Sequence, residues 1–234
     1  QGLNNARLTG SDYMRERARY FRRGWLLGLT IILAAAASFA GYKARPWTIR
    51  PRESYPASLS SEGITIAVEP LFKDALAAQV FDKNDMVTRG IMPLAVVVFN
   101  DNDFPIVLRA TSIELIQGDD HVHTLPVNEV VHRLFQKGSK GTWIPQPFPR
   151  INVDKGNQDA LEDFDHKFLH DKMVDAHGKG GGFLYLHVPE PADMAGYLSR
   201  ARLYIPQVYR QDTGAKMIFF EIDLKPAIDA VPAK

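Results

Sequence analysis

The hydrophobic positions of the chain fall into two patterns, one continuous run near the N-terminus and short alternating runs beyond it. The continuous run occupies residues 25–41, WLLGLTIILAAAASFAG, and contains no charged residue. As a helix that rises about 1.5 Å per residue, it would cover about 25 Å, slightly less than a hydrocarbon core of about 30 Å. Trp25, Tyr42 and Lys43 at its ends suit the two membrane interfaces. The pattern therefore predicts a transmembrane helix over residues 25–42.

A cleavable signal peptide is the alternative interpretation of the same run. Ser38 and Ala40 place small residues where signal peptidase requires them, and the apolar core before them is short. The segment before the run, residues 1–24, is long for the charged region of a signal peptide, which favours a retained anchor. Both interpretations remain open from the sequence.

Basic residues on the two sides of the run indicate its orientation. More of them precede the run than follow it closely: Arg7, Arg15, Arg17, Arg19, Arg22 and Arg23 against Lys43, Arg45, Arg50 and Arg52. Since cytoplasmic flanks carry the excess of Lys and Arg, we expect a single-pass protein of the cytoplasmic (inner) membrane with a cytoplasmic N-terminus and a periplasmic C-terminal domain. Residues 1–24 then form an Arg-rich juxtamembrane helix, on which Arg17 and Tyr20 share a face for a partner or for lipid headgroups.

The composition limits the function classes. The chain has no cysteine, which excludes a disulfide framework, a thiolate nucleophile and any metal centre that needs a cysteine ligand. Hydrophobic residues make up 45% of the chain and charged residues 24%, so the part beyond the apolar run has the composition of a folded module. Acidic residues slightly outnumber basic ones in that part, so nothing indicates a nucleic-acid partner.

Short strands are predicted beyond the apolar run. Residues 43–62 are Pro-rich and favour an extended linker, whereas residues 63–226 carry alternating or β-branched runs between turn residues. Strands are predicted at residues 63–68, 93–99, 106–108, 111–116, 183–188, 200–209 and 216–224, with helices at residues 72–81, 127–136 and 158–177. Pro206 indicates a bulge or an edge position. We therefore expect a mainly β fold, an immunoglobulin-like antiparallel β-sandwich with helical insertions, followed by a tail over residues 227–234.

Two strand–turn–strand segments carry a family resemblance. They are GIMPLAVVVFNDNDFPIVL at residues 90–108 and LYIPQVYRQDTGAKMIFFEIDL at residues 203–224. Together they resemble membrane-anchored bacterial domains of immunoglobulin-like sandwich type, similar to the LEA14/WHy class, over residues 64–224. The resemblance implies a non-enzymatic module whose strands form a scaffold and whose loops contact partners. The predicted helix at residues 158–177 departs from a compact seven-strand plan.

Candidate metal ligands occur at two places, of which the first is the segment EDFDHKFLHDKMVDAH at residues 162–177. His166 and His170 are four residues apart and Glu162 lies one turn earlier, so a helix would place all three on one face, where they could hold a divalent metal. The segment lacks the glutamate of an HExxH motif. The alternative is a solvated amphipathic helix that packs through its apolar side.

The second place is the pair His121 and His123, whose alternate positions on an extended segment project both imidazoles to one side. Asp119 and Asp120 could add oxygen ligands. The alternative is a surface turn that binds nothing.

Other polar or glycine-rich clusters indicate turns. The segments DKND at residues 82–85 and NDND at residues 100–103 lack the spacing of a calcium-binding EF-hand loop, and Asx turns explain both. The glycines at residues 178–182 follow a predicted helix and precede a strand, the reverse of the phosphate-binding order. We expect a flexible exit from the helix there.

These observations favour recognition over catalysis. We expect a non-catalytic accessory or assembly subunit of a larger, energy-transducing (respiratory or photosynthetic) membrane complex, without a cofactor, whose partners are other subunits and the lipid bilayer. Partner contacts are expected at Arg17, Tyr20, Trp25, Trp143, Ile144 and Phe148. Two alternatives stay open: a periplasmic metal- or ligand-binding module that uses His121 and His123 or His166 and His170, and a cell-envelope enzyme.

Overall fold

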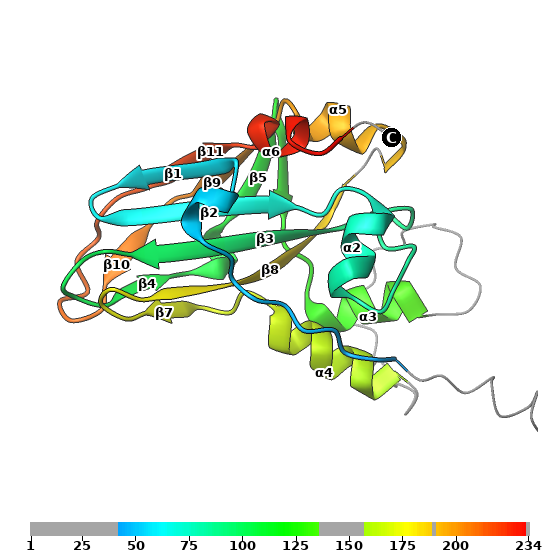
Figure 1. The fold of residues 1–234 in the computed structure, drawn as a ribbon, viewed down its shortest axis with the longest axis horizontal. Coiled ribbons are helices and arrows are strands. Elements are labelled where there is room, and N and C mark those ends of the chain that lie inside the picture. The colour runs from blue at the N-terminus through cyan, green and yellow to red at the C-terminus, as the bar shows by residue number, and fades with distance from the viewer. Residues whose placement is uncertain (1–41, 136–156, 189–190, 233–234) are drawn as a thin grey trace, which may run out of the picture. The chain divides into compact units, whose positions relative to one another are not determined.

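Antiparallel β-strands are the main secondary structure of the described residues, with a few helices beside them (Figure 1). The computed structural model describes residues 42–135, 157–188 and 191–232, all within the unit Tyr42–Lys234. The fold is therefore mainly β, as predicted.

Three sheets are present in these residues. Sheet A has the order β1 (Ala57–Ser61), β2 (Ile64–Pro70), β3 (Ile91–Asn100), β8 (Lys179–His187). Sheet B has the order β10 (Val208–Arg210), β4 (Ile106–Leu108), β7 (Lys172–Val174). Sheet C has the order β11 (Phe220–Asp223), β9 (Arg202–Ile205), β5 (Glu114–Gln117), β6 (Asp120–His123). The α-helices are α2 (Asp74–Val80), α3 (Val127–Phe135), α4 (Gln158–Lys167), α5 (Met194–Leu198) and α6 (Lys225–Asp229), and the 3-10 turns are η1 (Arg52–Ser54), η2 (Ala110–Ser112) and η4 (Pro191–Asp193).

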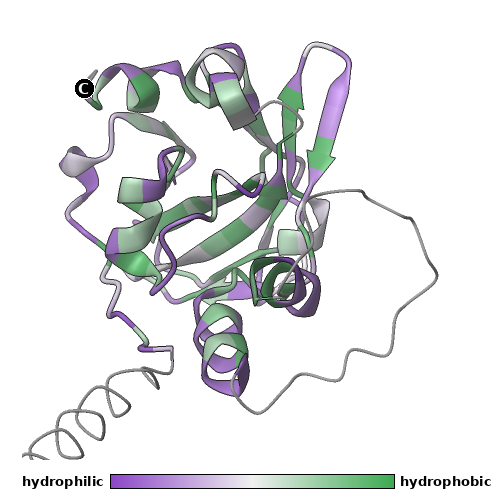
Figure 2. Cartoon of the chain, turned by 90° about the vertical axis from the view of Figure 1, so that its right-hand side faces the viewer, coloured by the Kyte–Doolittle hydropathy of each residue, from purple (hydrophilic) through white to green (hydrophobic). Residues whose placement is uncertain are grey.

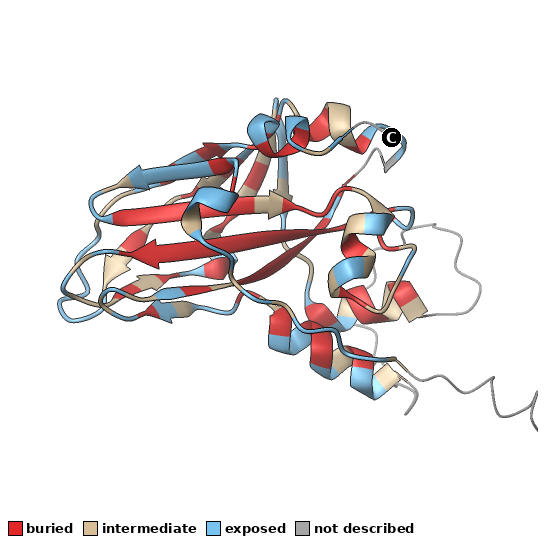
Figure 3. Cartoon of the chain, in the orientation of Figure 1, coloured by how far each residue is buried: buried red, intermediate tan, exposed pale blue. Residues whose placement is uncertain are grey.

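Strand β3 lies at the centre of the fold, and all of its residues are buried (Figure 3). It pairs with β2 on one side and with β8 on the other. Because side chains alternate along a strand, Leu94 and Val96 point into the core shared with sheet C, whereas Ile91 and Ala95 point towards the helices. A strand that is buried on both faces needs a covering layer on each side.

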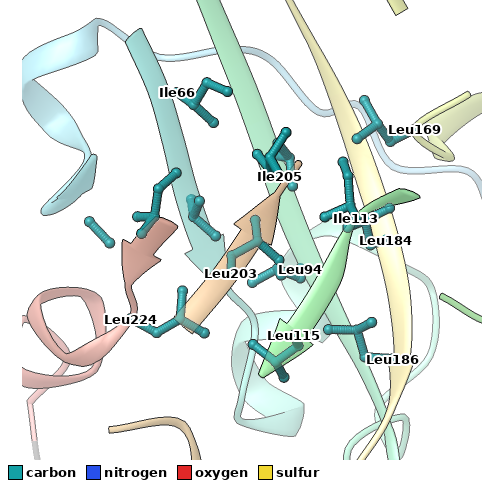
Figure 4. Close-up of a cluster of buried hydrophobic side chains, with 14 of the residues drawn as sticks. Ile66, Leu94, Ile113, Leu115, Leu169, Leu184, Leu186, Leu203, Ile205 and Leu224 are labelled. Carbon is teal, nitrogen blue, oxygen red and sulfur yellow. The ribbon is translucent and has the colours of Figure 1, made fainter. Parts of the chain in front are cut away.

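Sheet C forms the first covering layer. Leu94, Leu184 and Leu186 of sheet A meet Leu115 and Leu203 of sheet C in the main hydrophobic core (Figure 4). Strands β9 and β11 alternate between exposed and buried positions, so the other face of sheet C contacts solvent. Full burial of each such leucine contributes about 1.5–3 kcal/mol.

Helices α2, α3 and α4 form the second layer, on the other face of sheet A (Figure 1). Apolar residues of α3 recur with helical period, and Val130 and Leu134 are buried towards the sheet. Phe164 of α4 packs against Phe81 and Tyr185, with ring centroids 4.7 and 5.4 Å apart. In Figure 2 the helices show green towards the interior and purple on their outer sides.

Most predicted elements are confirmed within a few residues. Strands β2, β3, β4, β5, β8, β9, β10 and β11 occupy the predicted runs, and α2 and α3 occupy the first two predicted helices. Pro206 separates β9 from β10, and the chain passes there from sheet C to sheet B. The proline lacks a backbone donor, which suits a point where one strand ends and another begins.

The predicted helix over residues 158–177 is wrong beyond Lys167. Phe168 has extended backbone angles (φ −61°, ψ 140°) and forms a parallel bridge with Phe183 of β8. The backbone N–H of Leu169 donates a 2.9 Å hydrogen bond to the carbonyl oxygen of Phe183, and the Leu169 side chain is fully buried. Pairing with β8 therefore overrides the helical pattern, and the chain continues into β7.

The predicted linker over residues 43–62 is also wrong, because it belongs to the folded unit. Residues 57–61 form β1 and pair with β2. Tyr55 is 4% exposed and shares a small apolar cluster with Val97 and Phe99 of β3. The segment therefore covers a part of sheet A, and its apolar side chains pack on the sheet.

The glycines at residues 180–182 lie within β8 and do not form the expected flexible exit. A Cβ atom at Gly182 would lie 2.8 Å from the backbone nitrogen and Cα of Leu169. Glycine at this position therefore lets the chain that follows α4 pack directly on β8.

In the three described ranges, no helix is long and apolar enough to cross a membrane. The predicted juxtamembrane helix at residues 1–24 lies outside these ranges, as does the predicted transmembrane helix except for Tyr42.

We expect Gly182→Ala to lower the free energy of unfolding by about 1–3 kcal/mol, because the added methyl group overlaps backbone atoms that have no free rotation. Gly180→Ala is the matched control in the same strand. A Cβ atom there would meet only the Lys172 and Val174 side chains, at 3.2 Å, and these can move. Urea unfolding of the full chain in detergent measures both changes. Equal losses for the two variants would contradict the close-packing argument.

Candidate functional site

A polar cluster at the helical layer includes Tyr42, the first residue that the structure describes. The Tyr42 hydroxyl donates a hydrogen bond to Oδ2 of Asp163 in α4 at 2.5 Å. The ring of Tyr42 packs against Phe135 at the end of α3 and against Phe164, with centroids 5.9 and 6.0 Å apart. Tyr42 therefore joins the start of the folded unit to α3 and α4.

A buried ion pair completes this cluster. The Lys167 ammonium lies 2.6 Å from both carboxylate oxygens of Asp163 and donates to the carbonyl oxygen of Val80 at 3.0 Å. Each side chain of the pair is only 6% exposed. Burial lowers the pKa of Lys167, while the hydrogen bond and the charge of Asp163 oppose that lowering. The pair links α4 to the end of α2.

The chain that follows Tyr42 stays in contact with the domain, and we call residues 42–55 the strap. The backbone N–H of Lys43 and the guanidinium of Arg45 both donate to the carboxylate of Asp82, at 3.0 and 2.9 Å. The Lys43 hydrogen bond lowers the pKa of Asp82 below its ordinary value of 3.8; burial opposes this lowering, and Arg45 adds to it. Asp82 therefore holds the first residues of the strap.

The later part of the strap crosses sheet A. The Trp47 ring packs edge-on against Phe183, with centroids 4.8 Å apart. Arg52 then forms a bidentate ion pair with Asp101, with N···O distances of 2.7 and 2.8 Å. The strap is thus fixed at both ends and in its middle.

A groove of about 550 Å³ lies between the start of α3 and α4. Its lining includes apolar Leu161 and Phe168 and polar Glu162, Asp165 and His170. Apolar side chains beside two carboxylates suit a side chain that is apolar along its length and positively charged at its end.

The structure separates the predicted helical triad of metal ligands. Glu162 and His166 lie in α4, but α4 ends at Lys167, so His170 is not one helical turn beyond His166. The Nε2 atom of His170 lies instead 3.1 Å from the backbone oxygen of Asp165. The prediction of one shared helical face is therefore wrong, because the chain turns into extended backbone directly after the helix.

The β5–β6 hairpin brings a third side chain to the other histidine pair. His121 and His123 are exposed and share one side of β6, as predicted. The register places Glu114 of β5 opposite His123, and its Oε2 and Oε1 atoms lie 2.7 Å from Nδ1 of His121 and 3.9 Å from Nδ1 of His123. Asp120 alternates with His121 along the strand and so faces the other side. Across the described ranges, no group of three or more His, Asp or Glu residues is already arranged to hold a metal ion.

The polar cluster at residues 100–103 forms a turn, as predicted. Asn100 is 1% exposed, and its side-chain amide donates to the carbonyl oxygens of Phe104 and Asp175 at 2.8 and 3.0 Å. Its Oδ1 atom accepts from the backbone N–H of Asn102 at 3.1 Å, which closes an Asx turn.

Sequence reasoning missed the residues that these clusters depend on. Asp163 and Lys167 are four residues apart on one helix, a spacing that signals an ion pair but not its burial. Glu114 alternates with buried Leu115, which signals an outward position but not a neighbouring histidine. The predicted partner residues Arg17, Tyr20, Trp25, Trp143, Ile144 and Phe148 lie outside the described residues.

No protein-family model and no curated protein matches the chain. A similar solved structure is the crystal structure of a Bacillus subtilis subsp. subtilis str. 168 protein described as a "putative lipoprotein" (ycdA), at 13% identity and a TM-score of 0.35. The match covers 73% of this chain and 39% of that chain, so the chain spans well under half the length of that protein. A similarity at this level carries no argument about fold or function.

We expect Asp163→Asn to lower the free energy of unfolding by about 3–5 kcal/mol, because it leaves the buried Lys167 ammonium without its counter-charge. The double variant Asp163→Asn/Lys167→Met removes both charges and should recover most of the loss. Urea unfolding of the full chain in detergent, followed as a double-mutant cycle, measures the coupling. Additive effects of the two substitutions would show that the pair is not coupled.

Acid should weaken the attachment of the strap through Asp82. A carboxylate whose pKa is lowered by folding stabilises the folded state above its unfolded pKa, and this contribution is lost as the pH falls through the folded value. We therefore expect wild type to be more stable than Asp82→Asn at pH 6, with the difference shrinking below a pH of about 4. Urea unfolding at both pH values measures it, with Asp120→Asn as a surface control. A difference that is constant with pH would contradict the role of the charge.

Proposed function

We propose that the chain is a single-pass protein of the cytoplasmic membrane, anchored by a helix over residues 25–42. Its periplasmic domain, an immunoglobulin-like β-sandwich, serves as a non-catalytic accessory or assembly subunit of a larger membrane complex. The six arginines that precede the apolar run support this orientation.

The strap is the observation that carries the proposal. The described chain is bound to the domain from its first residue, through Tyr42 to Asp163, Arg45 to Asp82 and Trp47 to Phe183. No free spacer therefore remains in the 43–62 segment. A short tether suits a subunit that presents one surface to its neighbours, whereas a module that searches for distant ligands gains from a long flexible linker.

The packing of sheets A and C supports a sandwich scaffold. The two antiparallel sheets meet over one core, and sheet C keeps its other face in solvent. This arrangement leaves loops and outer faces available for recognition.

Exposed large apolar side chains of the described residues are few and lie on separate segments: Leu59, Met173 and Phe219. Single exposed apolar residues do not indicate an interface. We therefore assign the partner contacts to the aromatic and Arg-bearing segments that hold Trp143, Ile144 and Phe148, and Arg17, Tyr20 and Trp25.

The first test is the size of the assembly after gentle detergent extraction from the native membrane. Native electrophoresis with identification of co-migrating chains should show a species much larger than one chain, with constant companions. Migration as a single chain would overturn the proposal.

A second test uses the strap. A Gly-Ser insertion between Gly41 and Tyr42 lengthens the tether without changing the described domain, so we expect fewer co-migrating partners. The same insertion in the 211–214 turn is the matched control and should leave the assembly unchanged. Equal assembly of both variants would show that a short tether is not required.

A further inference from the structure

We propose that Glu114, His121 and His123 form a binding site for a divalent transition-metal ion, with Zn²⁺ as its probe. The inference does not depend on the proposed function. It rests on a juxtaposition that the strand register creates on the solvent face of sheet C.

The chemistry of the three side chains fits such an ion. Two imidazoles and one carboxylate are a ligand set that zinc and its neighbours accept, and either ring nitrogen of histidine can serve as the ligand. Both imidazoles turn Nδ1 towards the Glu114 carboxylate. In the part of the chain that the structure describes, these two histidines are the ion-pair partners of Glu114.

The distances are close to those that the ion requires. Ligands about 2.0–2.2 Å from a tetrahedral Zn²⁺ lie about 3.3–3.6 Å from one another. Oε2 of Glu114 lies 2.7 Å from Nδ1 of His121, below that range, and Oε1 lies 3.9 Å from Nδ1 of His123, above it. The imidazoles are 53% and 64% exposed, so both side chains have room to rotate, and the proposed site requires both Nδ1 atoms to turn onto one ion. The fourth position would be open to water.

The backbone beneath these side chains is held in place. Leu115 is fully buried between the two outward positions of β5, and Val122 packs against the main core between the two histidines. On its other side β5 pairs with β9, where Glu114 lies opposite Tyr204. Ligands on paired strands hold their relative positions better than ligands on loops, and this lowers the cost of assembling the site.

The hairpin differs in this respect from the helical candidates. His166 and His170 lie on different backbone elements, and His170 is directed to the backbone oxygen of Asp165. His166 is exposed, as His121 and His123 are, but it lies outside the hairpin. It is therefore a matched control for the loss of a surface histidine.

The test is a Zn²⁺ titration of the full chain in detergent, purified without a histidine tag, against a chromogenic chelator. We expect one ion per chain in wild type and a loss of affinity of at least about tenfold in His121→Asn, in His123→Asn and in Glu114→Gln. The variant His166→Asn should bind as wild type does. Far-UV circular dichroism confirms that each variant is folded.

Several results would overturn the proposal. Absence of saturable binding would do so, as would unchanged affinity in either hairpin histidine variant. Unchanged affinity in Glu114→Gln would remove the carboxylate from the ligand set and with it the three-ligand site. Loss of binding in His166→Asn would move the site to α4.

Discussion

The burial of β3 on both faces is the constraint on which the rest of the structure depends. Every residue of this strand is buried, so the chain must supply an apolar layer on each side of sheet A. Sheet C meets this need on one side through residues such as Leu115 and Leu203. The other side is covered in two parts, by the helices around Phe164 and by the strap around Trp47 and Tyr55. Helices and strap are therefore parts of the core, not additions to a sandwich.

The cluster of Tyr42, Asp163 and Lys167 shows how polar groups are used at that covering layer. A buried ion pair contributes little net stability, because desolvation of both charges offsets their attraction. What the cluster adds is selectivity for one arrangement: Asp163 and Lys167 both lie in α4, whereas the Tyr42 hydroxyl reaches the carboxylate only when the strap lies on that helix. A buried polar group without a hydrogen-bond partner is unfavourable. Placements of the strap that bury the Tyr42 hydroxyl away from Asp163 are therefore disfavoured.

Alternating apolar patterns predicted most strands, because period-two alternation reports directly on a half-buried strand. They could not predict the end of α4, where Leu169 pairs with β8, a contact between residues distant in the sequence. The linker prediction failed for a related reason. Proline content reports the local conformation of residues 43–62, and the part before the 3-10 turn at Arg52 indeed has no regular helix or strand, but it does not report the surface on which that chain lies. The histidine pair on β6 was visible from alternation, whereas Glu114 required the register between two strands.

The strap also determines when the domain can finish folding. Its first contact joins Tyr42 to Asp163, 121 positions later, and Trp47 waits for Phe183 in β8. A chain is synthesised from its N-terminus. Synthesis must therefore reach β8, the last strand of sheet A in sequence, before both of these partners are present. Until then the strap lacks these partners, and one face of β3 is incompletely covered. Closure of the strap is thus a late event, and it marks a domain whose sheet and helices are already in place.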